Sequence, residues 1–178
     1  MLVKRSAIEE LINSHEEYRK KCVNLIASEN VLSPYVKRYL ACDLVQRYGD
    51  YIGRDFAARK YQGTKWVEEV ESEVTTLAQE VFGAGYAELR AISGHIAGAA
   101  VLMALTKPGD VVLELGRDGG GHRMAAKLAV SPLISLDVKF MPFDPITYNV
   151  DVDGAVEMID RYRPRMVNLG SSCFLFPH

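Results

Sequence analysis

Two short segments of this 178-residue sequence carry side chains and glycines that can do chemistry, and the first is Ser93-Gly94-His95. It stands where a strand is expected to pass into a helix. A small residue and a glycine let backbone N–H groups approach a ligand, and a helix N-terminus favours an anion. The segment therefore predicts a phosphate site, although the simpler interpretation is that Ser93 is a helix N-cap and Gly94 a tight turn.

The second segment is the glycine-rich run from Gly116 to His122, which follows the next expected strand. Loops at the carboxyl edge of a parallel sheet line the ligand crevice, so this run is expected to lie at a binding site. It lacks the GxGxxG spacing and the acidic residue of a dinucleotide site. His122 can serve as a proton carrier, a stacking ring or merely a helix cap.

A third candidate is the long loop from Tyr48 to Gly63, in which Asp50 lies between Tyr48 and Tyr51. A carboxylate beside phenols can transfer protons, whereas a solvated loop with aromatic anchors is the simpler interpretation. The four histidines and three cysteines show no ligand spacing typical of a metal site, so we expect no metal.

Composition excludes several classes of protein. Apolar residues make up 48% and charged residues 25%, which is typical of a folded globular protein. The net charge of -2 argues against a nucleic-acid binder and gives no polybasic membrane patch. The longest apolar stretch, 97–105, is too short to span a membrane, and the N-terminus does not resemble a signal peptide. A cytoplasmic location is the resulting expectation.

The pattern of apolar residues predicts strands that alternate with helices, which is typical of an α/β fold with a largely parallel sheet. Two strands, Val111–Leu115 and Met166–Leu169, are expected to be buried on both faces. The sequence stops just after a strand, so we expect it to be part of a longer one. Helices are expected over 6–23, 34–47, 64–82, 93–106, from 122 and over 151–162, and strands over 88–92, 111–115, 138–143 and 166–169.

Taken in order, these segments resemble the serine hydroxymethyltransferase family. The similarity covers about residues 8–175, and the combination of NLIASEN with the SGH and GGH segments is specific. The segments that carry it are Asn24–Asn30, Arg47–Asp50, Lys60–Gly63, Val67–Glu71, Val81–Ala87, Ser93–His95, Lys107–Asp110, Gly120–His122 and Arg163–Met166.

The resemblance implies the aspartate-aminotransferase-like fold (fold type I) with pyridoxal 5'-phosphate (PLP) as cofactor. It implies exchange of a one-carbon unit between serine and glycine, with tetrahydrofolate or a related pterin as co-substrate. The chain would then hold a helical arm over 1–47 and the N-terminal half of the PLP-binding large domain over 48–178. A homodimer or other homo-oligomer, or a C-terminal partner chain, is the expected assembly.

The resemblance also implies roles for single residues near the cofactor. Ser93, Gly94 and His95 would lie at the PLP phosphate, where the third position is often Ser in the family. His122 would stack on the pyridine ring, and Ser172 would lie near the phenolic oxygen of the ring.

Other positions correspond to substrate and proton-transfer residues. Ser28 would contact the substrate carboxylate, and Tyr48 would reach the phosphate of the neighbouring subunit. Asp50 stands where the family has a catalytic glutamate, one methylene longer. Tyr61 matches the first of two tyrosines near the substrate, and Gln62 replaces the second.

The family's Schiff-base lysine, together with an aspartate and an arginine of the site, corresponds to positions beyond residue 178. We therefore expect the chain to be incomplete as an enzyme. Two alternatives remain open. One is a non-catalytic or split-enzyme subunit that pairs with a complete homologue, and the other is a different PLP-dependent aldolase.

Overall fold

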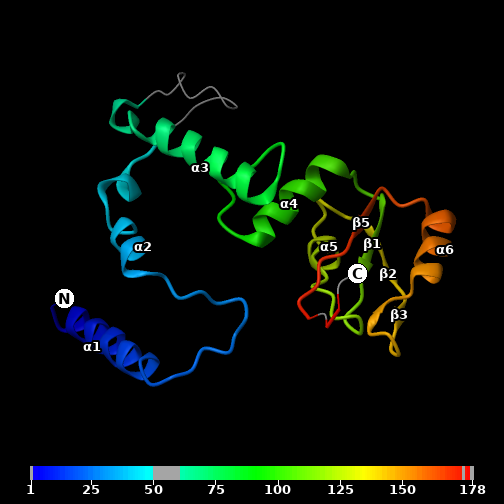
Figure 1. The fold of residues 1–178 in the computed structure, drawn as a ribbon, viewed down its shortest axis with the longest axis horizontal. Helices are drawn as coiled ribbons and strands as arrows, with labels where there is room; N and C mark the ends of the chain where they lie inside the picture. Colours follow the sequence, from blue (N-terminus) through cyan, green and yellow to red (C-terminus); the bar gives the residue numbers. More distant parts are fainter. Residues whose placement is uncertain (1, 50–60, 174, 177–178) are drawn as a thin grey trace. The chain divides into compact units, whose positions relative to one another are not determined.

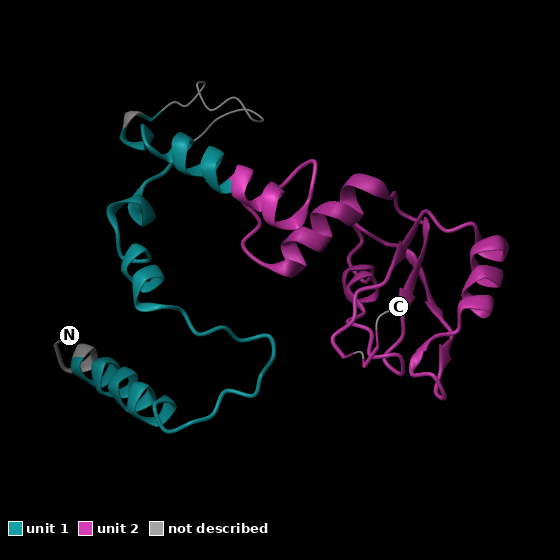
Figure 2. Ribbon diagram, viewed as in Figure 1, with its two compact units in different colours: residues 1–74 teal, residues 75–178 magenta. Residues whose placement is uncertain are grey.

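A computed structural model describes residues 2–49, 61–173 and 175–176 (Figure 1). The chain forms two compact units, residues 1–74 and residues 75–178 (Figure 2). No helix of the described residues is long and apolar enough to cross a membrane.

Helices make up the first unit, and two of the expected helices differ from those in the structure. The first helix begins before residue 6 and ends at Arg19 rather than at 23. The expected helix over 34–47 is broken after Tyr39, because the Leu40 and Cys42 N–H groups donate three residues back, to Lys37 and Tyr39, in a tighter turn. The elements are α1 (Leu2–Arg19), α2 (Pro34–Tyr39), η1 (Asp43–Gln46) and η3 (Gln62–Thr64).

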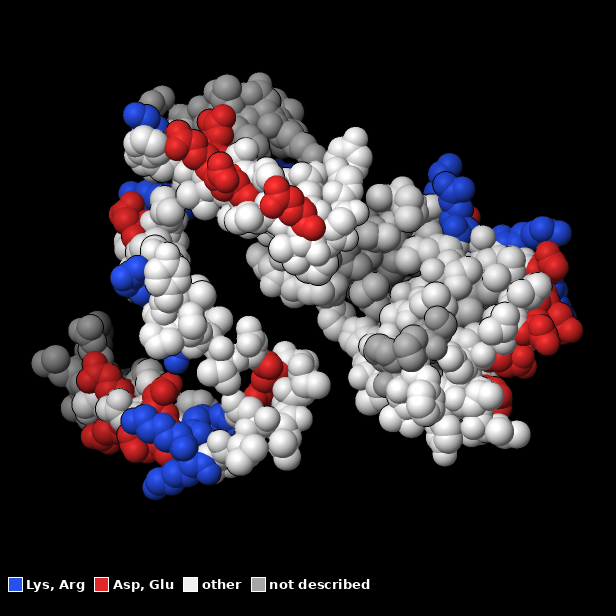
Figure 3. Space-filling view, in the orientation of Figure 1, with Lys and Arg blue, Asp and Glu red and all other residues white. Residues whose placement is uncertain are grey.

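The amphipathic helix α3 (Val67–Phe82) begins three residues later than expected and ends where Gly83 adopts a left-handed backbone, with φ of 58°. Figure 3 shows acidic side chains along this helix. Its apolar stripe is exposed, from 44% at Val74 to 75% at Val81. The stripe consists of Trp66, Val70, Val74, Leu77 and Val81. The stripe therefore contributes little to the core of the described chain.

The second unit contains a parallel sheet in the order β2-β1-β5, as the alternating pattern predicted. Strand β1 (Val111–Leu115) lies in the centre, with β2 (Asp137–Met141) and β5 (Met166–Asn168) on either side. Each crossover contains a helix, α5 (Met124–Leu128) between β1 and β2 and α6 (Val152–Tyr162) before β5. The remaining helix, α4 (Gly94–Leu105), precedes the sheet.

The core lies on both faces of this sheet, because successive side chains of β1 point to opposite faces. Leu113 and Leu115 pack with Met141 and with Ala155 of α6. Val112 packs on the other face with Leu102 of α4 and Ala125 of α5. Strand β1 is thus buried on both faces as expected, whereas Val167 of β5 remains 38% exposed.

Three further sequence expectations were wrong in detail. Residues 88–92 form no strand, because the Arg90 N–H donates locally to the Glu88 carboxylate instead of to a neighbouring strand. The expected strand 138–143 is interrupted at Pro142, which cannot donate a ladder hydrogen bond. Beyond it lies an unexpected hairpin of β3 (Phe143–Asp144) and β4 (Asn149–Val150), and α5 begins at Met124 rather than at 122.

The turn of this hairpin gives a testable pKa. The pKa of the Asp144 carboxyl lies below its ordinary value, because the Thr147 hydroxyl and the Ile146 N–H donate to the ionised form. Ionised Asp144 therefore stabilises the hairpin above the ordinary carboxyl pKa, and this contribution is lost as the pH falls through the lowered value. We expect Thr147→Val to raise the Asp144 pKa, measured by carboxyl NMR titration. An unchanged pKa would show that the Thr147 bond is not made.

Candidate active site

Segments from three parts of the second unit meet at the carboxyl ends of β1 and β5. The loop after β1 pairs with the loop after β5 through a bridge between Gly121 and Ser171. The His122 N–H donates to the Gly170 carbonyl at 3.1 Å, and the Ser172 N–H donates to the Gly120 carbonyl at 2.8 Å. These bonds place the predicted residues His122 and Ser172 at one sheet edge.

The N-terminus of α4 reaches the same place. The rings of His95 and His122 lie 4.9 Å apart between centroids and meet edge to face at 66°. Both segments were expected to lie at ligand sites, and this contact brings them together.

Ser93 is the N-cap of α4, as its simpler interpretation predicted, since its Oγ accepts the Ile96 N–H at 3.2 Å. Its O–H can still donate, because a hydroxyl both donates and accepts. The N–H groups of Gly94 and His95 open the helix, where no intrahelical acceptor is available to them. Open space surrounds the Gly94 Cα on the side where a Cβ would stand. The segment thus offers several donors to an anion.

Close backbone contact explains two glycines of the loop after β1. A Cβ on Gly121 would stand 2.0 Å from the Leu115 carbonyl oxygen, and one on Gly120 would stand 1.7 Å from that of Cys173. Gly120 also has φ of 74°, which disfavours side chains. Directly after His122, Arg123 has φ of 54°, a left-handed conformation that costs a non-glycine residue roughly 1–2 kcal/mol. The loop holds a constrained backbone at the candidate site.

Sequence reasoning missed two polar residues below this loop. Glu114 of β1 is fully buried, and its carboxylate accepts the N–H groups of Ala125 and Ala126 at 2.8 and 2.9 Å. The Asn168 side chain of β5 donates to the same carboxylate at 3.1 Å. Glu114 could have been found in the sequence, because it is the one charged residue inside the apolar strand VVLEL.

The predicted residues of the first unit are exposed. Ser28 lies in a turn closed by the Glu29 N–H, which donates to the Ile26 carbonyl. The Tyr48 and Tyr61 rings lie 5.1 Å apart between centroids, so the structure brings these two predicted residues together. Asp50 lies outside the described residues.

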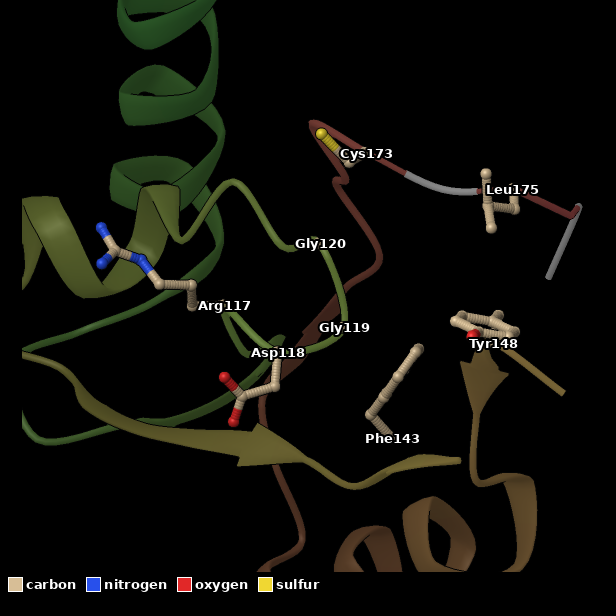
Figure 4. A pocket seen from close by; sticks show the side chains of 8 residues that line it. All are labelled: Arg117, Asp118, Gly119, Gly120, Phe143, Tyr148, Cys173 and Leu175. Carbon is tan, nitrogen blue, oxygen red and sulfur yellow. The ribbon is translucent and has the colours of Figure 1, made fainter. Parts of the chain in front are cut away.

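A cavity of about 450 Å³ opens beside the loop after β1. Figure 4 shows the aromatic side chains of Phe143 and Tyr148 on one side, while the side chains of Arg117 and Asp118 point away from them. The cavity is lined by Arg117, Asp118, Gly119, Gly120, Phe143, Tyr148, Cys173 and Leu175. The hairpin missed by the sequence analysis therefore builds one wall.

Comparison with known proteins decides the family. The family model described as serine hydroxymethyltransferase matches residues 3–176. The chain belongs to the serine hydroxymethyltransferase family. Serine hydroxymethyltransferases of Methanopyrus kandleri and Thermococcus onnurineus are 41% and 40% identical over 94% and 98% of this chain. That of Metallosphaera sedula is 40% identical over 95% of it.

The chain spans about two fifths of the length of these relatives, with 38%, 40% and 39% of each covered. Serine hydroxymethyltransferases are transferases of PLP fold type I and take tetrahydrofolate as co-substrate. The parallel sheet between helices agrees with that fold. The recognition of family and fold class from the sequence is thus confirmed.

The residues present fit the PLP cofactor of this family. Neutral N–H and hydroxyl donors at a helix N-terminus suit a phosphate dianion. The half-buried His122 and the exposed Ser172 stand at the same sheet edge, where a ring and a hydroxyl can meet a planar aromatic ligand. Ser93, Gly94 and His95 would hold the phosphate, and His122 and Ser172 would face the ring.

Proposed function

We propose that the chain is the N-terminal part of a PLP-dependent serine hydroxymethyltransferase that interconverts serine and glycine with a reduced pterin. The single observation that carries this proposal is the contact of His95 with His122, which joins the α4 N-terminus to the loop after β1. When bound, PLP supplies an electron sink for cleavage of the Cα–Cβ bond of serine.

In this proposal the residues of the second unit bind and orient the cofactor. The Ser93 hydroxyl and the N–H groups of Gly94 and His95 would donate to the phosphate oxygens. The His122 ring would pack on the pyridine face and limit the access of water, and the Ser172 hydroxyl would donate to the phenolic oxygen. By holding the phosphate, these residues would orient the ring for the reaction.

Residues of the first unit would serve the substrate. We propose that Ser28 contacts the substrate carboxylate, that Asp50 moves protons and that Tyr61 lies near the substrate. Tyr48 would reach the phosphate of a neighbouring subunit in a homodimer. The helical arm 1–47 and the large-domain part 48–178 remain the proposed division of the chain, and the cytoplasm its proposed location.

We infer that the lysine that anchors PLP in the family corresponds to no segment of residues 1–178. We therefore propose that the chain works together with the lysine-bearing part of a serine hydroxymethyltransferase. The exposed apolar stripe of α3 is available to such a part or to a second copy.

The phosphate site can be tested without the aldehyde of PLP, which reacts with surface lysines. Pyridoxine 5'-phosphate should shift the backbone amide signals of Ser93, Gly94 and His95 in NMR spectra, and pyridoxine without the phosphate should not. Ser93→Ala should weaken the phosphate compound about tenfold or more, since it removes a hydrogen bond to a charged group.

Ser33→Ala is the matched control for this test. Ser33 caps α2 through a 3.2 Å bond to the Val36 N–H, the same distance as the Ser93 bond to Ile96. We expect the control to leave the affinity unchanged. Equal weakening by both substitutions, or equal binding with and without the phosphate, would contradict the proposed site.

A further inference from the structure

We propose that Glu114 is a positioning residue that holds the His122 ring at the candidate cofactor site, an inference that rests on the proposed function. Glu114 does not face the crevice. It lies inside the sheet, fully buried, on the face that carries α4 and α5. Its effect therefore passes through the backbone segments that it binds.

The first of these segments is the start of α5. Arg123 is the N-cap of this helix, and its side chain makes no capping hydrogen bond. The Glu114 carboxylate instead accepts the N–H groups of Ala125 and Ala126 with its two oxygens. A strand residue thus provides the cap that the helix lacks in its own sequence. Only Arg123 and Met124 separate His122 from this anchor.

The second segment is the loop after β5. Asn168 stands opposite Glu114 in the parallel register and donates to its Oε1 at 3.1 Å. The Asn168 Oδ1 accepts the Gly170 N–H at 3.1 Å, and the Gly170 carbonyl accepts the His122 N–H. Glu114 therefore holds His122 from both sides, through α5 and through the Gly170 turn.

A buried carboxylate without a cation needs its hydrogen bonds. Among the described residues Glu114 forms no ion pair, and its three partners are neutral N–H donors. Such donors stabilise a carboxylate strongly when water is absent. Glutamine has the same shape but only one acceptor oxygen. Its NH₂ group would face an N–H donor, either at α5 or at Asn168.

The experiment compares Glu114→Gln with the unchanged chain by NMR in the absence of cofactor. We expect the cross-relaxation signal between the His95 and His122 ring protons to fall several-fold. Amide hydrogen exchange at Ala125 or Ala126 should become about tenfold faster or more, since a hydrogen bond to a charged acceptor is lost.

Two controls separate positioning from general destabilisation. Glu157→Gln changes an exposed glutamate of α6 and should alter neither signal. Leu113→Ala removes core volume on the opposite face of β1, so it should lower stability while the ring contact of His95 and His122 persists. Loss of that contact in Leu113→Ala as well as in Glu114→Gln would overturn the inference.

A double variant tests the route through β5. Glu114→Gln with Asn168→Asp exchanges the amide and the carboxylate, so the side-chain bond between the two strands is restored while position 168 keeps an acceptor for Gly170. We expect Gly170 amide exchange to return toward its original rate while that of Ala126 or Ala125 stays fast. Gly170 amide exchange that stays as fast in the double variant as in Glu114→Gln would contradict the route through β5.

Failure of the inference differs from failure of the proposed function. If the contact of the His95 and His122 rings and the amide exchange of Ala125 and Ala126 are unchanged in Glu114→Gln, the positioning role is overturned. This holds whether or not the chain binds pyridoxine 5'-phosphate. A lost ring contact together with no binding of pyridoxine 5'-phosphate to the unchanged chain overturns the cofactor site and leaves the positioning of His122 standing.

Discussion

Gly120→Ala is expected to unfold the sheet edge that carries His122 and Ser172. The added Cβ would stand 1.7 Å from the Cys173 carbonyl oxygen, and the φ of 74° disfavours any side chain. Overpacking costs typically 1–3 kcal/mol and a left-handed non-glycine about 1–2 kcal/mol, so the free energy of unfolding should fall by about 2–5 kcal/mol. Denaturant unfolding monitored by circular dichroism measures this loss.

Two other glycines separate the causes of this loss. Gly83 has φ of 58° with nothing within 4 Å of an added Cβ, so Gly83→Ala measures the backbone strain alone. Gly85 has open space as well and no positive φ, so Gly85→Ala should be nearly neutral. If Gly120→Ala cost no more than Gly83→Ala, the two loops would not be packed as the structure has them.

Much of the second unit follows from local sequence patterns. Strand β1 is a short apolar run, and Ser93 before an alanine-rich segment gave the start of α4 because an N-cap depends only on neighbouring residues. The His122 loop was expected at the carboxyl edge of a parallel sheet and lies there, whereas His95 reaches that edge without the strand that was expected before Ser93.

Other features could not be predicted from local sequence patterns in the same way. Residues 88–92 have a strand-like composition, but a strand exists only where another backbone pairs with it. The helix break after Tyr39 has neither proline nor glycine, the residues that usually indicate a break. The β3–β4 hairpin has no Asn-Gly turn, which is the sequence pattern that predicts a hairpin.

Glu114 shows a similar difficulty at the site. A charged residue in an apolar strand indicates that something is buried, yet the partners are an α5 turn and an asparagine 54 residues away. Register decides that Glu114 faces α5 while Leu113 and Leu115 face α6. The sequence alone indicates that Glu114 is unusual, but it does not predict which groups hydrogen-bond to it.

Turnover of serine is expected only when the chain is combined with the lysine-bearing part of the family. In the proposed function, residues 1–178 offer donors to the PLP phosphate and a ring at His122, while the lysine-bearing part of the family supplies the covalent anchor for the cofactor. Without that amine the bond-breaking transition state is not stabilised. Purified chain should form no detectable glycine from serine and tetrahydrofolate.

Adding the remaining region of the Methanopyrus kandleri relative as a separate chain should restore turnover. In that mixture His122→Ala should lower kcat about 100-fold, because a misplaced cofactor ring loses the alignment of the reacting bond. His15→Ala, which changes an exposed histidine of α1, should leave kcat unchanged. Glycine formation by the chain alone that survives replacement of every lysine in it would show that the amine is not needed. The proposed division of the site between two parts would then be wrong.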